Sequence, residues 1–340
     1  MSSDDRTGSV RAEVTEVPTP TAGPGELLVE MKTCGLCGTD IEKAKGEYKA
    51  ALPILGHEAV GLVSEVGQGV KEFRRGDRVF PHHHVPCHEC YYCRSGDETS
   101  CLKYRTSNIF PGGFSEFFRV PAWNVAKGGV LRLPQGLDFR EASLIEPVGC
   151  CIRALNKCKL RKDDTVLIVG AGPVGILHSI LLRLKGAKTI ISDISEQRLL
   201  FAEKLGVERT IDVRNRNVTK EVNEWTNGRG ADAVIVASGN PAAIKQALES
   251  VRNAGKVCLF GVPSRGSVLD YDFSDLYNRE VSLFPSYGAT ESEIGLALSQ
   301  IETNHDIFRS LITHDFPIIE YSKAVDVVTS GAGTKVLITS

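Results

Sequence analysis

The sequence has almost no net charge. Its 340 residues include 40 Lys and Arg against 42 Asp and Glu, which gives a net charge of −2 and an isoelectric point near 6.5. Proteins that bind nucleic acid or an anionic membrane through their surface field carry a broad excess of basic residues. The charge balance therefore argues against nucleic acid and membrane surfaces as partners.

The sequence also lacks an apolar run long enough to cross a membrane. The longest candidate, Val166–Leu182, has 17 residues and is interrupted by four glycine or proline residues, whereas a spanning helix needs about 20 apolar residues. The opening MSSDDRTGSV is polar and acidic, without the charged-then-apolar layout of a signal peptide. These features predict a soluble, cytoplasmic protein with reduced cysteines.

Repeats, low-complexity tracts and long charge runs are absent as well, and the chain has two styles of sequence. The length suggests about two domains at roughly 100–200 residues each. From about residue 27 to 134, short strand signals broken by Gly and Pro indicate a compact, mostly antiparallel unit. From residue 164 to about 285, apolar runs such as TVLIV alternate with amphipathic helices, which predicts an α/β unit with a doubly wound parallel sheet. The tail after about residue 290 is expected to pack on the first unit.

Ten cysteines are too few for a disulfide-dense miniprotein, but four of them are closely spaced. They read C-x2-C-x2-C-x7-C and are Cys87, Cys90, Cys93 and Cys101. Four thiolates at this spacing close a tetrahedral Zn²⁺ site with no open position, so the predicted zinc is structural. The alternatives are two disulfides, which a cytosolic setting disfavours, or four unrelated cysteines.

A glycine-rich loop directly follows the predicted strand TVLIV and opens a predicted helix. It reads Gly170-Ala171-Gly172-Pro173-Val174-Gly175, and the strand and helix around it are the context that a dinucleotide-binding loop requires. Asp193 closes the next strand about 20 residues on, where a carboxylate can accept hydrogen bonds from ribose hydroxyls. A 2′-phosphate would be repelled there, so NAD is favoured over NADP, although Arg198 could stack on adenine or pair with a phosphate.

A second, mixed set of metal ligands lies around the cysteine cluster: Cys37 in GLCGTD, His57 and Glu58 in LGHE, and Glu146 in LIEPVG. Three protein ligands leave a fourth position of Zn²⁺ open, as catalytic sites require. Other readings are possible for each residue. Cys34 and Cys37 could form a redox pair, His57 could be a core histidine, and Glu146 could be an acid at the start of a helix.

Taken in order, CGTD, GHE, the four cysteines, EP, GAGPVG and Asp193 resemble the zinc-containing medium-chain dehydrogenases over nearly the whole chain. Within that family the segment SLIEPVG is most similar to the polyol branch, typified by sorbitol dehydrogenase. The resemblance implies a GroES-like, mostly β catalytic domain over residues 1–149 and 288–340, and a Rossmann NAD-binding domain over residues 150–287. It also implies two Zn²⁺ per chain, NAD, an alcohol or polyol substrate, and a homodimer or homotetramer.

The resemblance also implies roles for individual residues. Cys37 and His57 would hold the catalytic zinc, and Glu58 or Glu146 would contribute directly or through water. Thr39 would accept the proton of the substrate hydroxyl. Besides the glycine-rich loop, Asp193 and Arg198, the residues that resemble the branch's NAD contacts are Val174, Gly261, Val262 and Ser286.

The chain departs from the branch near the expected substrate. Glu42 stands where the family often has the histidine that ends a proton relay, and Lys43 and Ser286 replace a Tyr and an Arg of sorbitol dehydrogenase. The substrate is thus open between a polyol and a threonine-like amino alcohol, and a non-catalytic NAD-binding protein is an alternative of another class. Residues 82–84, three consecutive histidines, could form a third metal site, but consecutive residues on a strand point to alternating faces. An exposed loop is expected instead, since no further convergent ligands accompany them.

Overall fold

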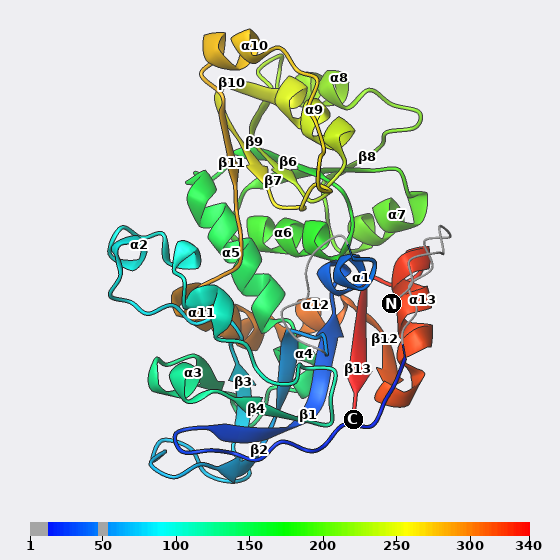
Figure 1. Cartoon of the computed structure of the whole chain (residues 1–340). Helices are drawn as coiled ribbons and strands as arrows, with labels where there is room; N and C mark the ends of the chain where they lie inside the picture. Colours follow the sequence, from blue (N-terminus) through cyan, green and yellow to red (C-terminus); the bar gives the residue numbers. More distant parts are fainter. Residues whose placement is uncertain (1–12, 47–53) are drawn as a thin grey trace. The chain divides into compact units, whose positions relative to one another are not determined.

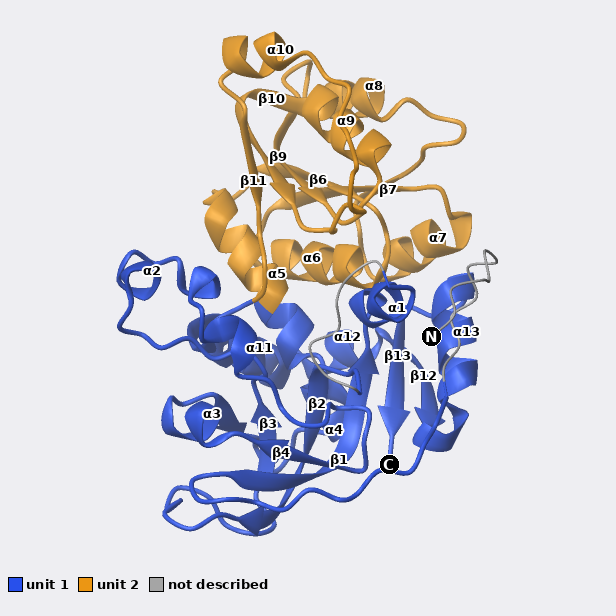
Figure 2. Cartoon of the chain, viewed as in Figure 1, with its two compact units in different colours: residues 1–149, 289–340 blue, residues 150–288 orange. Residues whose placement is uncertain are grey.

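The computed structural model describes residues 13–46 and 54–340 (Figure 1). They fall into two compact units, one drawn from residues 1–149 and 289–340 and the other from residues 150–288 (Figure 2). The acidic opening segment considered above lies outside the described residues. Among those described, no helix is both long and apolar enough to cross a bilayer.

Unit 1 is built on a mostly antiparallel sheet in the order β12-β13-β1-β2-β3-β5, with β4 also paired to β1. The strands are β1 (Leu27–Leu36), β2 (Glu58–Val66), β3 (Arg78–Pro81), β4 (Phe117–Val120), β5 (Val130–Arg132), β12 (Ile312–Pro317) and β13 (Lys335–Thr339). β12 and β13 run parallel, and the other strand pairs formed by the described residues of this sheet are antiparallel. The last strand, β13, pairs with the first, β1, and Figure 1 shows them side by side.

Short helices and loops surround this sheet, and they carry most of the polar residues of interest. The helices are α1 (Gly38–Ala44), α2 (Tyr91–Arg94), α3 (Ala122–Ala126), α4 (Phe139–Ala142), α11 (Glu291–Thr303), α12 (His305–Arg309) and α13 (Tyr321–Ser330), and α5 (Ile145–Cys158) begins in this unit. Single turns of 3-10 helix lie at Glu98–Ser100, Tyr104–Thr106 and Ile318–Glu320. Residues such as Leu27, Met31 and Phe118 are fully buried and form the core with α13.

Unit 2 is a six-stranded parallel sheet in the order β11-β10-β9-β6-β7-β8. Its strands are β6 (Thr165–Val169), β7 (Lys188–Asp193), β8 (Arg209–Asp212), β9 (Ala231–Val236), β10 (Val251–Leu259) and β11 (Ser282–Pro285). The connecting helices are α6 (Pro173–Leu184), α7 (Glu196–Lys204), α8 (Val218–Trp225), α9 (Pro241–Ser250) and α10 (Phe273–Asn278). Every residue of β6 and β9 is buried, as expected for strands covered on both faces. This confirms the doubly wound sheet, whose strand order reverses beside β6.

Candidate metal and dinucleotide sites

The four cysteines of the predicted structural lobe converge on one point. Their sulfurs all lie within 4.8 Å of one another, with Cys87 Sγ 3.8 Å and Cys90 Sγ 3.6 Å from Cys93 Sγ. A tetrahedron of Zn–S bonds of about 2.3 Å places its sulfurs about 3.8 Å apart. The backbone amide of Cys90 also donates to Cys87 Sγ, at 3.2 Å. Spacing and donor chemistry therefore both fit a closed zinc site.

The structure brings together three members of the second ligand set. Cys37 precedes α1, His57 precedes β2 and Glu58 is the first residue of β2, and each offers a ligand atom within 4.8 Å of the other two. A thiolate, an imidazole and a carboxylate are all zinc ligands. Three donors leave one position of a tetrahedral ion open. The set therefore fits a zinc with catalytic coordination.

Asp40 orients the imidazole of His57. Its Oδ1 lies 3.2 Å from His57 Nδ1, while its Oδ2 accepts a hydrogen bond of 3.1 Å from the Cys37 amide. Burial opposes the charged imidazole, yet the negative charge of Asp40 and its hydrogen bond raise the pKa of His57 well above its ordinary value. A carboxylate on Nδ1 fixes the tautomer that presents Nε2 to a metal. Sequence reasoning quoted Asp40 in CGTD but gave it no role.

Glu58 is paired with Lys335, the first residue of β13. The Lys335 ammonium donates to Glu58 Oε2, and both side chains are buried. Gly35 makes the space, since a Cβ there would lie 1.8 Å from Glu58 Oε2 and 2.8 Å from Lys335 Cε. Burial raises the pKa of Glu58, and the charges of Lys335 and His57 counteract that rise without cancelling it. Lys335 was not predicted from the sequence. The one sign of its role there is that a lysine begins the apolar strand KVLITS.

Glu146 and Thr39 lie outside the cluster of three ligand atoms. Glu146 is a buried residue of α5, and its charge contributes to the raised pKa of Glu58. Thr39 is half-buried in the first turn of α1, two residues after Cys37. Glu58 therefore lies closer to Cys37 and His57 than Glu146 does. Thr39 belongs to α1, the helix that directly follows Cys37.

Residues 82–84 lie in a loop as expected, but the expected exposure is wrong. His82 and His83 are buried and His84 is half-buried. Asn124 Nδ2 holds the backbone by donating to His82 O, at 2.8 Å, and the His83 ring lies 5.3 Å from that of His57. Alternation along a strand does not apply, because β3 ends at Pro81. The histidines instead pack inward beside the candidate metal site.

In unit 2 the glycine-rich loop has the backbone that a dinucleotide loop needs. Gly170 has a φ of 108°, which favours glycine. A Cβ on Gly175 would lie 1.9 Å from Gly170 O, so the third glycine is required for α6 to approach β6. A Cβ on Gly172 would meet no atom within 4 Å, which leaves open space at the N-terminus of α6. Pro173 begins the first turn and has no N–H itself, whereas the amides of Val174 and Gly175 in that turn can attract phosphate.

The other predicted cofactor residues lie at the same edge of the sheet. Asp193 ends β7, Gly261 and Val262 follow β10, and Ser286 follows β11. Asp193 Oδ2 accepts from the Ala171 amide at 2.6 Å, and the Arg198 guanidinium lies 4.0 Å from the same oxygen. In parallel sheets the carboxyl ends of the strands form the ligand crevice. Unit 2 thus presents its predicted nucleotide residues on one edge.

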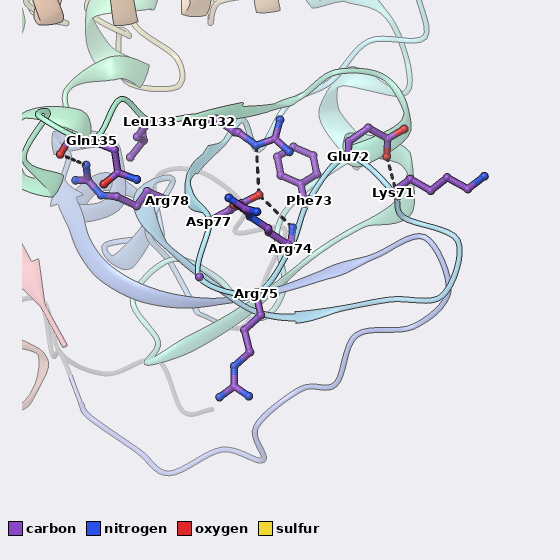
Figure 3. Close-up of a pocket in the computed structure, with 11 residues that line it drawn as sticks. Lys71, Glu72, Phe73, Arg74, Arg75, Asp77, Arg78, Arg132, Leu133 and Gln135 are labelled. Atoms are coloured by element: carbon purple, nitrogen blue, oxygen red, sulfur yellow. Dashed lines mark hydrogen bonds and ion pairs between the residues drawn. The ribbon is translucent and has the colours of Figure 1, made fainter.

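Unit 1 also has a pocket of about 540 Å³ around the turn between β2 and β3 (Figure 3). Asp77 accepts from the Arg74 amide at 3.1 Å and from Arg132 Nε at 3.3 Å. Arg78 donates to Pro134 O at 2.6 Å, and Figure 3 shows Arg75 extending away from these groups. The guanidinium groups of Arg74 and Arg132 both pair with Asp77, at 3.4 and 3.3 Å, and that of Arg78 binds backbone oxygens, so these cations are already matched within the fold. We therefore interpret this pocket as structural.

Comparison with known proteins agrees with the order of these sites along the chain. The sequence model of the alcohol dehydrogenase GroES-like domain matches residues 23–133, and that of the zinc-binding dehydrogenases matches residues 173–303. A sorbitol dehydrogenase from Halalkalibacterium halodurans is 32% identical over 98% of this chain and 96% of that protein. The chain belongs to the zinc-containing medium-chain dehydrogenases. An L-threonine 3-dehydrogenase from Idiomarina loihiensis is 31% identical over 96% of this chain and 95% of that protein.

Solved structures of this dehydrogenase family share the fold. A zinc-binding dehydrogenase from Sinorhizobium meliloti bound to NADP has a TM-score of 0.86 at 27% identity, covering 98% of this chain and 97% of that one. The alcohol dehydrogenase from Thermus sp. ATN1 has a TM-score of 0.86 at 28% identity, covering 97% and 96%. The predicted combination of a GroES-like domain and a Rossmann domain is confirmed. The chain is accordingly an oxidoreductase that uses zinc and a nicotinamide dinucleotide.

Proposed function

We propose that this dehydrogenase transfers hydride from a secondary alcohol of a polyol or sugar alcohol to NAD. The observation that carries the proposal is the convergence of Cys37, His57 and Glu58, within 4.8 Å of one another, in a chain that also has an open glycine-rich loop. The sorbitol dehydrogenase relative supports the polyol class. A redox pair of Cys34 and Cys37 is disfavoured, because the Cys34 thiol is fully buried and packs in the hydrophobic core.

Cys37, His57 and Glu58 would hold the catalytic ion, and Glu146 would lie outside this set of three ligands. A zinc ion there would lower the pKa of a hydroxyl group beside it. Asp40 keeps Nε2 of His57 directed away from its own carboxylate, and Lys335 balances the charge of Glu58. The Thr39 hydroxyl would take the proton that the substrate loses. Glu42, which we considered as the end of a proton relay, pairs with Lys45 at 3.1 Å.

The nucleotide residues of unit 2 favour NAD over NADP. Asp193 is buried at the end of β7, and the amides of Ala171 and Ser195 hold its two oxygens at 2.6 and 2.8 Å. A fixed carboxylate would repel a 2′-phosphate and accept hydrogen bonds from ribose hydroxyls. Arg198, 4.0 Å from Asp193, would then lie over the adenine end. Gly261, Val262 and Ser286 would complete the nicotinamide side of this edge.

A threonine-like amino alcohol is the second candidate substrate. Relatives named L-threonine 3-dehydrogenase match nearly the full chain at almost the same identity as the sorbitol dehydrogenase. They share the zinc and nucleotide chemistry, so the difference must lie in residues that line the substrate pocket. A direct comparison of the two substrate classes decides between them.

We also propose that the chain forms a homodimer or homotetramer. The edge strand β11 pairs only with β10 in the part of the chain that the structure describes. Nearby in sequence, α10 exposes two aromatic side chains, Phe273 at 63% and Tyr277 at 85%. A second copy would satisfy the open edge and cover the aromatic surface. Light scattering after gel filtration, with Tyr277→Lys as the disrupted variant, tests this assembly.

The function is tested by zinc content and by a substrate panel. Protein loaded with zinc should contain two ions per chain and should produce NADH from polyols. Cys37→Ala should retain one zinc, lose turnover and still bind NADH, because the glycine-rich loop is unchanged. Cys150→Ala, a half-buried cysteine of unit 2, is the matched control and should keep both ions. Near-normal turnover by Cys37→Ala with one zinc would contradict the proposal.

A further inference from the structure

A small polar pocket lies beside His57 in unit 1. It is lined by Lys43 of α1, by His57, His83 and His84, by Asn108, and by apolar neighbours such as Ile109. Its volume is about 40 Å³, about three times the roughly 10–15 Å³ of such space that one water molecule needs. The pocket can therefore take one substituent of a substrate whose reacting carbon lies at the candidate metal site, but not a whole sugar.

The positive charge in this pocket belongs to Lys43. Lys43 is half-buried, and within residues 13–46 and 54–340 no acceptor lies within hydrogen-bond or ion-pair distance of its ammonium, although Asp40 lies within its electrostatic range. The one acid that lines the pocket, Asp40, is already bound to His57 and to the amides of Cys37 and Gly56. The Lys43 ammonium therefore keeps its hydrogen-bonding capacity for a ligand of the pocket.

His83 also has an unmet hydrogen-bonding requirement. Its side chain is 8% exposed, and its buried Nδ1 has no partner among the described residues. An unpaired buried polar atom costs on the order of 1–3 kcal/mol. Buried polar atoms in native proteins almost always have a hydrogen-bond partner, so a buried atom without one calls for a water, an ion or a ligand. Asn108, whose Nδ2 also donates to Arg105 O at 3.3 Å, and Lys43 line the same pocket.

We infer that the pocket binds an anionic oxygen substituent of the alcohol, a carboxylate or a phosphate ester, with Lys43 as its counter-ion and His83 as a hydrogen-bond donor. This inference rests on the proposed function and specifies its substrate class. It makes Lys43 a specificity-determining residue. A sugar-alcohol phosphate would satisfy it, and so would a hydroxy amino acid, whereas an uncharged polyol would leave the lysine unpaired.

Two matched substrate pairs test the inference with zinc-loaded enzyme and saturating NAD. One pair is a hexitol and its terminal phosphate ester, and the other is L-threoninamide and L-threonine. We expect the anionic member of one pair to have the higher kcat/KM, and the pair concerned distinguishes phosphate from carboxylate. Lys43→Gln should reduce the ratio of anionic to neutral kcat/KM about 10- to 100-fold, the effect of one charge-assisted hydrogen bond. Lys43→Arg should keep most of that ratio.

Lys45→Gln is the matched control, because Lys45 lies two residues away, is exposed and pairs with Glu42. It should leave the ratio unchanged, and NADH binding by each variant shows that the protein is folded. The inference is overturned if wild-type enzyme prefers the neutral member of both pairs, or if Lys43→Gln lowers both kcat/KM values equally. In either case the proposed alcohol oxidation still stands. If no alcohol yields NADH, the proposed function fails and this inference with it.

Discussion

The ammonium of Lys335 and the carboxylate of Glu58, 277 residues apart in sequence, form a buried ion pair across β1, between the first residue of β13 and the first residue of β2. Lys335 is 4% exposed and Glu58 is 1% exposed. Their contact ties the last strand of the chain to a residue of the candidate metal site. Gly35 of β1 lies beside this contact, and because glycine has no Cβ the two side chains have room to meet.

Removing Lys335 should therefore destabilise unit 1. Loss of one partner of a buried pair leaves an uncompensated charge and costs about 3–5 kcal/mol. We expect Lys335→Met to lower the free energy of unfolding by about that amount in urea titrations, and Lys335→Met/Glu58→Gln to recover part of the loss. An unchanged unfolding midpoint for Lys335→Met would contradict this account.

Asp40→Asn should weaken zinc binding without unfolding the protein. The substitution keeps the shape of the side chain but removes the charge that orients His57 through Nδ1. Such supporting carboxylates are worth about 10- to 100-fold in metal affinity. Competition with a chelator should show that loss for one of two zinc ions, and excess zinc should restore turnover. Glu42→Gln on the same helix is the control, and equal zinc affinity in both variants would refute the role of Asp40.

Local sequence was sufficient where spacing alone determines geometry. The four cysteines lie within one short loop, so their convergence could be predicted from C-x2-C-x2-C-x7-C. The glycine-rich loop was readable for the same reason, because β6 and α6 are adjacent in the chain. The parallel sheet followed from the alternation of buried runs and helices.

Long-range contacts were beyond that reasoning. Lys335 meets Glu58 only because β13 pairs with β1 and β1 pairs with β2, a register that no local pattern encodes. His82 and His83 were misplaced for a related reason. Their burial depends on Asn124, about 40 residues on, which holds the backbone through His82 O. Asp40, by contrast, stands three residues after Cys37, so its hydrogen bond from the Cys37 amide is local and could have been predicted as part of a helix cap.

Asp193→Asn should relax the choice of cofactor. The asparagine can still accept one backbone hydrogen bond, but it no longer repels a 2′-phosphate beside Arg198. We expect the ratio of kcat/KM for NAD over NADP to fall at least about 10-fold. The repulsion between the Asp193 carboxylate and the 2′-phosphate, which the substitution removes, costs more than about 1.4 kcal/mol. Initial rates with each cofactor measure it. Asp212→Asn, at the end of the adjacent strand β8, is the control, and a ratio unaffected by Asp193→Asn would exclude this role.

His178 gives the fold a defined sensitivity to acid. It lies fully buried in α6 with its ring edge-on to Phe260, at 4.7 Å between centroids, and neither ring nitrogen has a partner in the described part of the chain. Burial lowers the pKa of His178 from 6.5 to about 3. Above pH 6.5 the imidazole is neutral in both folded and unfolded chains. Between pH 6.5 and 3 only the unfolded chain takes up the proton, so the free energy of unfolding decreases as the pH is lowered.

The expected slope from this one residue is about 1.4 kcal/mol per pH unit below pH 6.5. His178→Leu removes the titration, so its free energy of unfolding should decline less steeply than that of wild type between pH 6 and 4 by about that slope. Urea unfolding at several pH values, with both proteins in the same zinc concentration, gives the difference. His305→Gln is the control, because His305 is exposed beside Asp306. Parallel curves for His178→Leu and wild type would mean that His178 takes up its proton in the folded chain as readily as in the unfolded one.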